Sequence, residues 1–257
     1  GGVFASIWGV YNLLPEHLRK NVIGVIVNKF RGDLSLFDEG IRIIQEDFKI
    51  PVLGVLPYLP FNLGFEDSAS LKNFVQQPRN KKLDIAVIGY PYMSNYNDFE
   101  PLIADDEVFV EFVSSNISLE KFDLVILPGS KLVIKDLIWL KQTGLFEQIK
   151  NYKKDICAIC GGYEMMFESL NDIYALENEQ ALKEEGFGFI PDIITFEKEK
   201  ILEKKTYDLF GEKIAGFEIH HGICKNYPLS FEKQNFKGTF VHQIFDNNEF
   251  RTKYFKS

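Results

Sequence analysis

The stretch that most restricts the fold of this chain is DICAICGGYE, residues 155–164. It is typical of a buried strand that ends at Cys160 and turns through two glycines directly into a helix, which we expect to continue over residues 165–170. At such a turn the side chain is pushed out of the sheet, and small neighbours permit a strained backbone. The free amide groups and dipole of a helix N-terminus favour a thiolate. Cys160 is therefore the cysteine placed for covalent chemistry.

Strand-like and helix-like segments alternate along the chain, which predicts a mostly parallel sheet with helices on both faces. After residue 186 the pattern becomes richer in strands. The expected strands are 22–28, 52–56, 83–89, 108–113, 122–127, 155–160, 190–196, 213–221 and 238–242, and the expected helices are 34–48, 131–142 and 145–152.

A polar segment, residues 76–82, separates two parts of the chain, and we predict a domain boundary near residue 80. The predicted domains are 1–80 and 81–257. The first is short for a domain, and it contains no G-x-x-x-x-G-K-[ST] phosphate loop. We therefore expect residues 1–80 to be part of a larger α/β domain.

Composition excludes several classes of function. The net charge of -8 and the pI near 5.2 argue against a nucleic-acid surface. No apolar stretch approaches the roughly 20 residues of a membrane span. Three cysteines in an acidic chain of this size suggest a reducing compartment, so the expected location is the cytoplasm.

A cysteine nucleophile needs a base, most often histidine. The chain has four histidines, of which His17 lies in a polar, exposed segment. His220 and His221 end one predicted strand and His242 ends another, and active sites of open α/β sheets gather at strand ends. The sequence does not choose between these two strand ends. The His220–His221 pair has no carboxylate or cysteine at ligand spacing, so we predict no metal site.

An oxyanion hole is expected beside such a nucleophile, because backbone N–H groups stabilise the charge that develops on an attacked carbonyl. The N–H of Gly161, the residue after Cys160, is one natural donor. The turn Leu127–Ser130, which ends a buried strand and opens a helix, offers Gly129 as a second.

These residues carry a resemblance to a known family. The Cys160-Gly-Gly-Tyr163 segment with the downstream His242 resembles the class I (triad) glutamine amidotransferase domain. Over nearly the whole chain, in order, the sequence is similar to the cobyric acid synthase family. The segments that carry this similarity are 28–33 (NKFRGD), 51–58 (PVLGVLPY), 128–131 (PGSK), 136–140 (DLIWL), 186–191 (GFGFIP), 216–220 (GFEIH) and 238–242 (GTFVH).

The resemblance implies a flavodoxin-like α/β amidotransferase domain preceded by part of a phosphate-loop-type α/β domain, similar to dethiobiotin synthetase. It implies that Cys160 attacks the glutamine amide to form a γ-glutamyl thioester, with His242 as general base and acid. Gly129 and Gly161 hold the oxyanion, and Tyr163, Glu164 and His220 are the expected substrate-binding residues.

The resemblance also implies partners beyond glutamine. In the family, the ammonia amidates side-chain carboxylates of cobyrinic acid a,c-diamide, a corrinoid, at a site that uses ATP and Mg²⁺. We expect no cofactor within this chain itself, because the phosphate-loop half of the ATP-binding domain is missing from it.

Three departures from the family pattern concern the site. Glu164 stands where a substrate-binding glutamine is usual, and a carboxylate there would place charge beside the thiolate. Ala158 stands two residues before Cys160, where the family pattern has a glycine. Ile244 stands where typical class I domains have a glutamate that orients the histidine; Asp246 or Glu218 are the sequence's candidates for that role.

Two alternatives stay open. Glu164 and the missing phosphate loop would also suit a catalytically degenerate domain retained for binding or assembly. A related carboxylate amidotransferase is the other alternative, either a cobyrinic acid a,c-diamide synthase or the glutaminase subunit of a peptidoglycan-precursor amidating enzyme. The segment 28–33 argues against both of these related amidotransferases.

Overall fold

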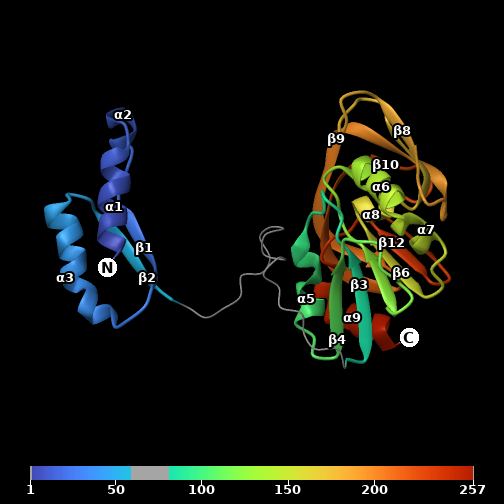
Figure 1. The fold of residues 1–257 in the computed structure, drawn as a ribbon, viewed down its shortest axis with the longest axis horizontal. Coiled ribbons are helices and arrows are strands. Elements are labelled where there is room, and N and C mark those ends of the chain that lie inside the picture. The colour runs from blue at the N-terminus through green and yellow to red at the C-terminus, as the bar shows by residue number, and fades with distance from the viewer. Residues whose placement is uncertain (1, 59–80, 257) are drawn as a thin grey trace. The chain divides into compact units, whose positions relative to one another are not determined.

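The computed structural model describes residues 2–58 and 81–256 (Figure 1). Contacts within the chain divide it into two compact units, Gly1–Leu63 and Gly64–Ser257. The domain boundary that we predict near residue 80 lies outside the described residues.

The first unit is built on a pair of parallel strands, β1 and β2. Its small core contains Val27, Ile44 and Ile50, against which apolar residues of α1 pack. The predicted helix 34–48 is a continuous helical run that changes from 3₁₀ to α to π geometry. The elements are α1 (Gly2–Leu13), α2 (Glu16–Arg19), β1 (Val25–Phe30), η1 (Leu34–Phe37), α3 (Asp38–Arg42), η2 (Ile43–Asp47) and β2 (Val52–Pro57).

The second unit contains a six-stranded sheet in the order β11-β12-β6-β5-β3-β4. All neighbours pair in parallel except β11, which is antiparallel to β12. Taken in chain order, the five parallel strands have the flavodoxin-like order 2-1-3-4-5, so the predicted fold class is confirmed. The strands are β3 (Leu83–Ile88), β4 (Val108–Val113), β5 (Leu124–Leu127), β6 (Asp155–Ile159), β11 (Ser230–Lys233) and β12 (Phe236–Thr239).

The central strands are apolar because both of their faces are covered. All four residues of β5 are buried, as are the last four of β6. The helical elements of this unit are η3 (Tyr96–Phe99), α5 (Glu100–Ile103), α6 (Val133–Thr143), α7 (Leu145–Lys150), α8 (Gly161–Glu164), η4 (Ile244–Asp246) and α9 (Asn248–Lys256).

A second sheet of four strands has the order β10-β9-β7-β8. Its main feature is a long antiparallel hairpin of β9 and β10, visible in orange and red in Figure 1. The hairpin is longer than the predicted strands 190–196 and 213–221. The strands are β7 (Phe167–Asp172), β8 (Leu182–Glu185), β9 (Ile190–Leu209) and β10 (Glu212–Ile223).

The predicted helix over residues 165–170 is wrong. The helix after Cys160 is the single turn α8, and the chain then continues as strand β7. β7 pairs with β8 on one side and with β9 on the other, so its backbone groups are satisfied within the second sheet. Tertiary pairing therefore overrides the apolar spacing that suggests a longer helix.

Candidate active site

Cys160 lies at a strained turn directly after β6. Its backbone has φ 50° and ψ -112°, a conformation that non-glycine residues rarely adopt. The Cys160 amide N–H donates to Thr239 O, and its carbonyl accepts from the N–H of Glu164, the last residue of α8. These bonds hold the residue from both sides, as expected of strain that is kept at a functional position.

The glycines after Cys160 let the turn approach the end of β5. A Cβ atom on Gly162 would lie 2.2 Å from the carbonyl oxygen of Leu127, and one on Gly161 would lie 2.7 Å from the backbone nitrogen of Ser130. Both contacts are with backbone atoms, which have little freedom to move. Glycine is therefore required at these two positions by close packing.

Replacing Gly162 by alanine is expected to lower the free energy of unfolding by about 3 kcal/mol, because the added methyl group overpacks against fixed backbone. Urea denaturation followed by circular dichroism measures this change. Gly188→Ala is the matched control, since nothing lies within 4 Å of its Cβ position and only its φ of 73° opposes the change, at a cost of about 1 kcal/mol. Equal losses in the two variants would contradict the packing argument.

His242 follows β12 and is fully buried next to the cysteine. Its Nδ1 lies 2.6 Å from Oδ2 of Asp98, with both side chains about 1% exposed. Burial alone would lower the pKa of His242, but the Asp98 carboxylate and the Cys160 thiol outweigh it and raise that pKa to about 10. The geometry thus favours an imidazolium ion at neutral pH, between a carboxylate and the sulfur.

Asp98 is the acid that orients His242, and neither acid suggested by the sequence takes this role. Glu218 pairs with His220 Nε2 at 3.2 Å instead, and Asp246 is exposed. Asp98 lies on η3, in the segment that follows β3, and its Oδ1 also accepts from the N–H of Gln243. The carboxylate therefore fixes both the ring and the backbone of the residue after His242.

A cavity of about 300 Å³ opens over the cysteine. Lys131 and Lys200 line the cavity and are exposed to solvent, whereas Glu164 lines it and is buried. Burial raises the pKa of Glu177 to about 7, although hydrogen bonds from backbone N–H groups at the start of α6 lower it. The lining residues are Ser94, Asn95, Ser130, Lys131, Val133, Cys160, Glu164, Leu176, Glu177, Phe196, Lys200, Ile219, His220, His221 and His242.

Glu164 has a carboxyl group that is buried without full hydrogen bonding. Its side chain is 2% exposed, and Oε1 has no hydrogen-bond partner among the described residues. Burial raises the pKa of Glu164 well above its ordinary 4.5, and the Cys160 thiol and Glu177 raise it further; the Gly222 backbone and Lys200 oppose them. The carboxyl group is therefore favoured in its neutral form, which places no negative charge beside the thiol.

Two other expected substrate-binding residues have different surroundings. His220 lines the cavity, stacks on Phe240 at 3.8 Å and is held through Nδ1 by Gly222 O at 2.8 Å. Tyr163 lies in the core instead, fully buried, with its hydroxyl donating to Tyr227 O at 3.1 Å. Its ring packs at the Gly238 position, and Tyr163 does not line the cavity.

The turn after β5 borders the same site. The position of a Cβ on Gly129 is 3.1 Å from Cε1 of His242, and Ser130 meets Gly161 as described above. Ser130 Oγ donates to Asp136 Oδ2 at 2.6 Å, and the N–H of Tyr92 donates to the other oxygen of this buried carboxylate at 3.0 Å. Of the two expected oxyanion glycines, Gly129 thus lies beside the His242 ring and Gly161 beside Ser130.

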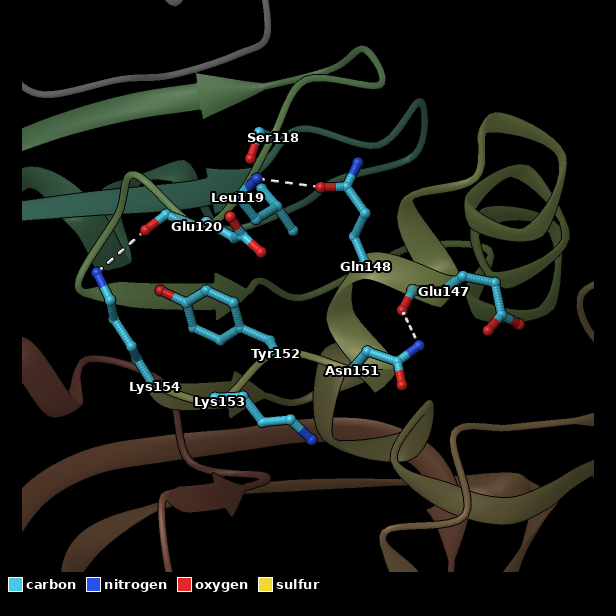
Figure 2. Close-up of a pocket in the computed structure, with 9 residues that line it drawn as sticks. All are labelled: Ser118, Leu119, Glu120, Glu147, Gln148, Asn151, Tyr152, Lys153 and Lys154. Carbon is cyan, nitrogen blue, oxygen red and sulfur yellow. Dashed lines mark hydrogen bonds between the residues drawn. The ribbon is translucent and has the colours of Figure 1, made fainter.

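A larger cavity, of about 660 Å³, lies elsewhere on the domain (Figure 2). Its lining includes Lys154, which precedes β6, whereas Cys160 follows the same strand, so the two cavities are at opposite ends of β6. Some of the polar groups drawn in Figure 2 are bonded to one another, as where Gln148 accepts from the N–H of Leu119 at 3.0 Å. This cavity contains no nucleophile paired with a base.

Metal-binding groups and membrane-spanning helices were also considered for the part of the chain that the structure describes. Within residues 2–58 and 81–256 there is no group of three or more histidine, cysteine or acidic side chains that could hold a metal ion. No helix of the described part of the chain is long and apolar enough to span a membrane.

A strained cysteine after a central strand, with a buried histidine–aspartate pair beside it, is the arrangement typical of cysteine-dependent enzymes of the triad type, here in a flavodoxin-like domain. The family model of the CobB/CobQ-like glutamine amidotransferase domain matches residues 84–250, and the chain belongs to this family. The match spans β3 to α9 and includes Asp98, Cys160 and His242.

Relatives extend the similarity over the first unit as well. The chain is 69% identical over 257 residues to a cobyric acid synthase of Acinetobacter baylyi, covering 100% of this chain and 55% of the relative. Cobyric acid synthases of Clostridium tetani and Clostridium perfringens are each 39% identical, over 98% of this chain and 55% of theirs. The chain therefore spans about half the length of the curated relatives it matches.

Proposed function

We propose that the Cys160 site hydrolyses glutamine, and that the intact protein uses the ammonia as a cobyric acid synthase. The observation that carries the first part is the convergence of Cys160, His242 and Asp98 at one end of the sheet, under a cavity of about 300 Å³. The shared description of the relatives supports the second part, and it does not favour a degenerate domain or a different amidotransferase.

The chemistry follows from the positions of the three side chains. The Cys160 sulfur, as thiolate, attacks the amide carbon of glutamine, and the negative charge moves to the former carbonyl oxygen. His242, as imidazolium, gives its proton to the amide nitrogen, which leaves as ammonia from a γ-glutamyl thioester. Water then attacks the thioester as His242 takes up a proton, and glutamate leaves with the cysteine restored.

Substrate recognition is assigned to the cavity walls. Glu164 and His220 are the proposed glutamine contacts, because both line the cavity and Glu164 Oε1 has no hydrogen-bond partner among the described residues. A neutral carboxylic acid has one O–H donor and acceptor capacity, so Glu164 can act much as the glutamine that is usual at this position. The Gly129 and Gly161 amides are the proposed oxyanion donors.

Replacing Glu164 by glutamine tests its protonation state. Between pH 4.5 and the raised pKa, the unfolded chain loses the Glu164 proton and the folded protein keeps it, so the wild type loses stability as pH rises. The variant lacks this loss, and its advantage in free energy of unfolding should grow by up to about 1.4 kcal/mol per pH unit. Glutamine hydrolysis at pH 7 should stay within about 3-fold of wild type, since the two side chains are nearly isosteric.

Urea titrations from pH 5 to 8 measure the difference. Glu168→Gln, an exposed neighbour on β7, is the control and should show no growing advantage. If the stability of Glu164→Gln relative to wild type does not change with pH, Glu164 is ionised in the folded protein and this interpretation is wrong.

The ATP-dependent amidation is assigned to the part of the relatives' length that this chain does not match. The residues of this chain do not fit ATP phosphates, because no G-x-x-x-x-G-K-[ST] loop occurs in the sequence. ATP and Mg²⁺ are therefore proposed for the intact enzyme only, with a corrinoid, cobyrinic acid a,c-diamide, as acceptor of the ammonia.

Three free cysteines support a cytoplasmic location.

The decisive experiment is incubation of the wild-type protein with millimolar glutamine, measuring glutamate and ammonia together. Equal release of both is expected, with little turnover of asparagine, whose amide is one methylene closer to the backbone. Labelling with 6-diazo-5-oxo-norleucine followed by peptide mass mapping should place the adduct on Cys160. Absence of turnover, or equal labelling at other residues, would exclude the glutaminase assignment.

A further inference from the structure

The cavity at Cys160 carries charged side chains that the hydrolysis step does not use. Glu177, Lys131 and Lys200 line it, in addition to the residues of the reacting centre. Glutamine at neutral pH carries an α-ammonium and an α-carboxylate besides its amide. Because charged groups that leave water need partners of opposite sign, these charged walls can recognise the α-carbon end of the substrate.

Glu177 is held on the cavity wall by backbone contacts. The N–H of Ile134, in the first turn of α6, donates to its Oε2 at 3.2 Å. The N–H groups of Leu176 and of Glu177 itself donate to the Asp172 carboxylate at 2.8 and 3.0 Å, and Asp172 is 0% exposed. A side chain fixed in this way loses little conformational freedom when it binds a cation.

The Glu177 carboxyl group can accept a further partner. It is only half-buried, and a carboxylate has about four acceptor sites, of which the Ile134 N–H occupies one. Burial raises the pKa of Glu177 to about 7, so much of the group is ionised at neutral pH. A bound ammonium group would favour the ionised form further, since an opposite charge stabilises it.

Lys200 is the lysine whose charge reaches the buried part of the cavity. Burial, the Cys160 thiol and Glu177 raise the pKa of the Glu164 carboxyl group, whereas Lys200 lowers it. The charges of Glu177 and Lys200 thus both act on Glu164. Neither forms an ion pair with another described residue, so both are available to a ligand.

We infer that Glu177 binds the α-ammonium group of glutamine and that Lys200 binds its α-carboxylate, with the side-chain amide directed to Cys160. The inference rests on the proposed glutaminase function and adds to it the basis of substrate choice. A simple amide lacks one or both charges, and a glutamine residue inside a peptide has lost both to amide bonds. The two side chains would therefore select free glutamine over these other amides.

The test pairs each variant with an amide that lacks the matching charge. Glutaramic acid is glutamine without the α-ammonium group, and 4-aminobutanamide is glutamine without the α-carboxylate. Glu177→Gln should lower kcat/KM for glutamine about 10- to 100-fold, mainly through KM, because a charge-assisted contact is lost. It should leave kcat/KM for glutaramic acid within about 3-fold of wild type, and Lys200→Met should show the same pattern with 4-aminobutanamide.

Protection of Cys160 from iodoacetamide gives the Kd of each amide, including those that are hydrolysed too slowly to follow. These Kd values should show the same pattern as kcat/KM. Without added amide the alkylation rate should equal that of wild type in both variants, as expected of an intact elbow. Glu179→Gln and Lys204→Met are the matched controls, because both residues are exposed and lie outside the cavity, and they should stay within about 3-fold for all three amides.

The outcomes separate recognition from a structural role. If a variant loses as much kcat/KM and affinity for its matching analogue as for glutamine, the side chain does not bind the missing charge and the inference is overturned. Unchanged KM and Kd for glutamine in both variants would overturn it as well. A wild type without glutamine turnover instead overturns the proposed function, and this inference with it.

Discussion

Replacing Cys160 by serine is expected to reduce glutamine hydrolysis by at least about 10⁴-fold, with folding unchanged. The substitution keeps the size of a side chain that is 6% exposed, so packing around the elbow is retained. What is lost is a nucleophile that His242, held protonated by Asp98, can maintain as an anion. A serine hydroxyl at the same place would need a neutral histidine as base, and the charge of the Asp98 carboxylate opposes that form.

The measurement is steady-state release of glutamate, with thermal unfolding recorded in parallel. Cys224→Ser is a close control, because Cys224 has the same exposure of 6% and is also a free thiol. The control should retain turnover within about 3-fold, as a substitution outside the reacting groups. Full activity in Cys160→Ser would mean that hydrolysis takes place elsewhere or comes from a contaminating glutaminase.

The position of Cys160 at a strained turn between a strand and a helix was predictable, because the signals for that turn are local. A short apolar strand, a cysteine and two glycines occupy eight consecutive residues, 155–162, and each has one physical reason to be there. The glycines are required by contacts with Leu127 and Ser130, about 30 residues earlier in the chain, yet their effect on the turn is visible from composition alone. The alternation of strands and helices likewise predicted a mostly parallel sheet.

Asp98 was not predictable because the contact depends on strand order. It lies 144 residues before His242 in the chain, and the two meet because the segments after β3 and β12 come together at the carboxyl end of the sheet. The acids that the sequence suggests for this role are Asp246 and Glu218, but Asp246 is exposed and Glu218 pairs with His220. An acidic residue soon after the first strand of a 2-1-3-4-5 sheet was the available signal, since strand ends near the switch point collect functional groups.

The second sheet was also only partly predictable. Residues 165–170 are apolar at a spacing compatible with a helix, but β7 gains its hydrogen bonds from β8 and β9, which follow it in the chain. Tyr163 was expected at the substrate because of its place in the motif. Its orientation depends on Gly238 and Phe240 of a distant segment, whose packing turns the ring into the core.

Replacing Asp98 by asparagine is expected to lower kcat for glutamine about 10²- to 10⁴-fold, as for other acids that orient a catalytic histidine. The asparagine can still bond to the ring, but it carries no charge. Without the Asp98 carboxylate, burial is less opposed and the pKa of His242 falls from about 10. At neutral pH the ring is then more often neutral, so it neither pairs with the thiolate nor supplies the proton that ammonia needs to leave.

The pH dependence gives this prediction a second readout. In the wild type the raised pKa of His242 contributes stability that is complete below about pH 6.5 and is lost as pH rises toward 10. Urea titrations should show that loss in the wild type and much less of it in Asp98→Asn, and iodoacetamide alkylation of Cys160 at pH 7 should slow in the variant. Asp246→Asn is the control, since Asp246 is exposed, and it should leave kcat, alkylation and the loss of stability between about pH 6.5 and 10 unchanged. A variant at Asp98 with wild-type kcat, or an equal loss at Asp246, would show that His242 takes its orientation and charge from another group.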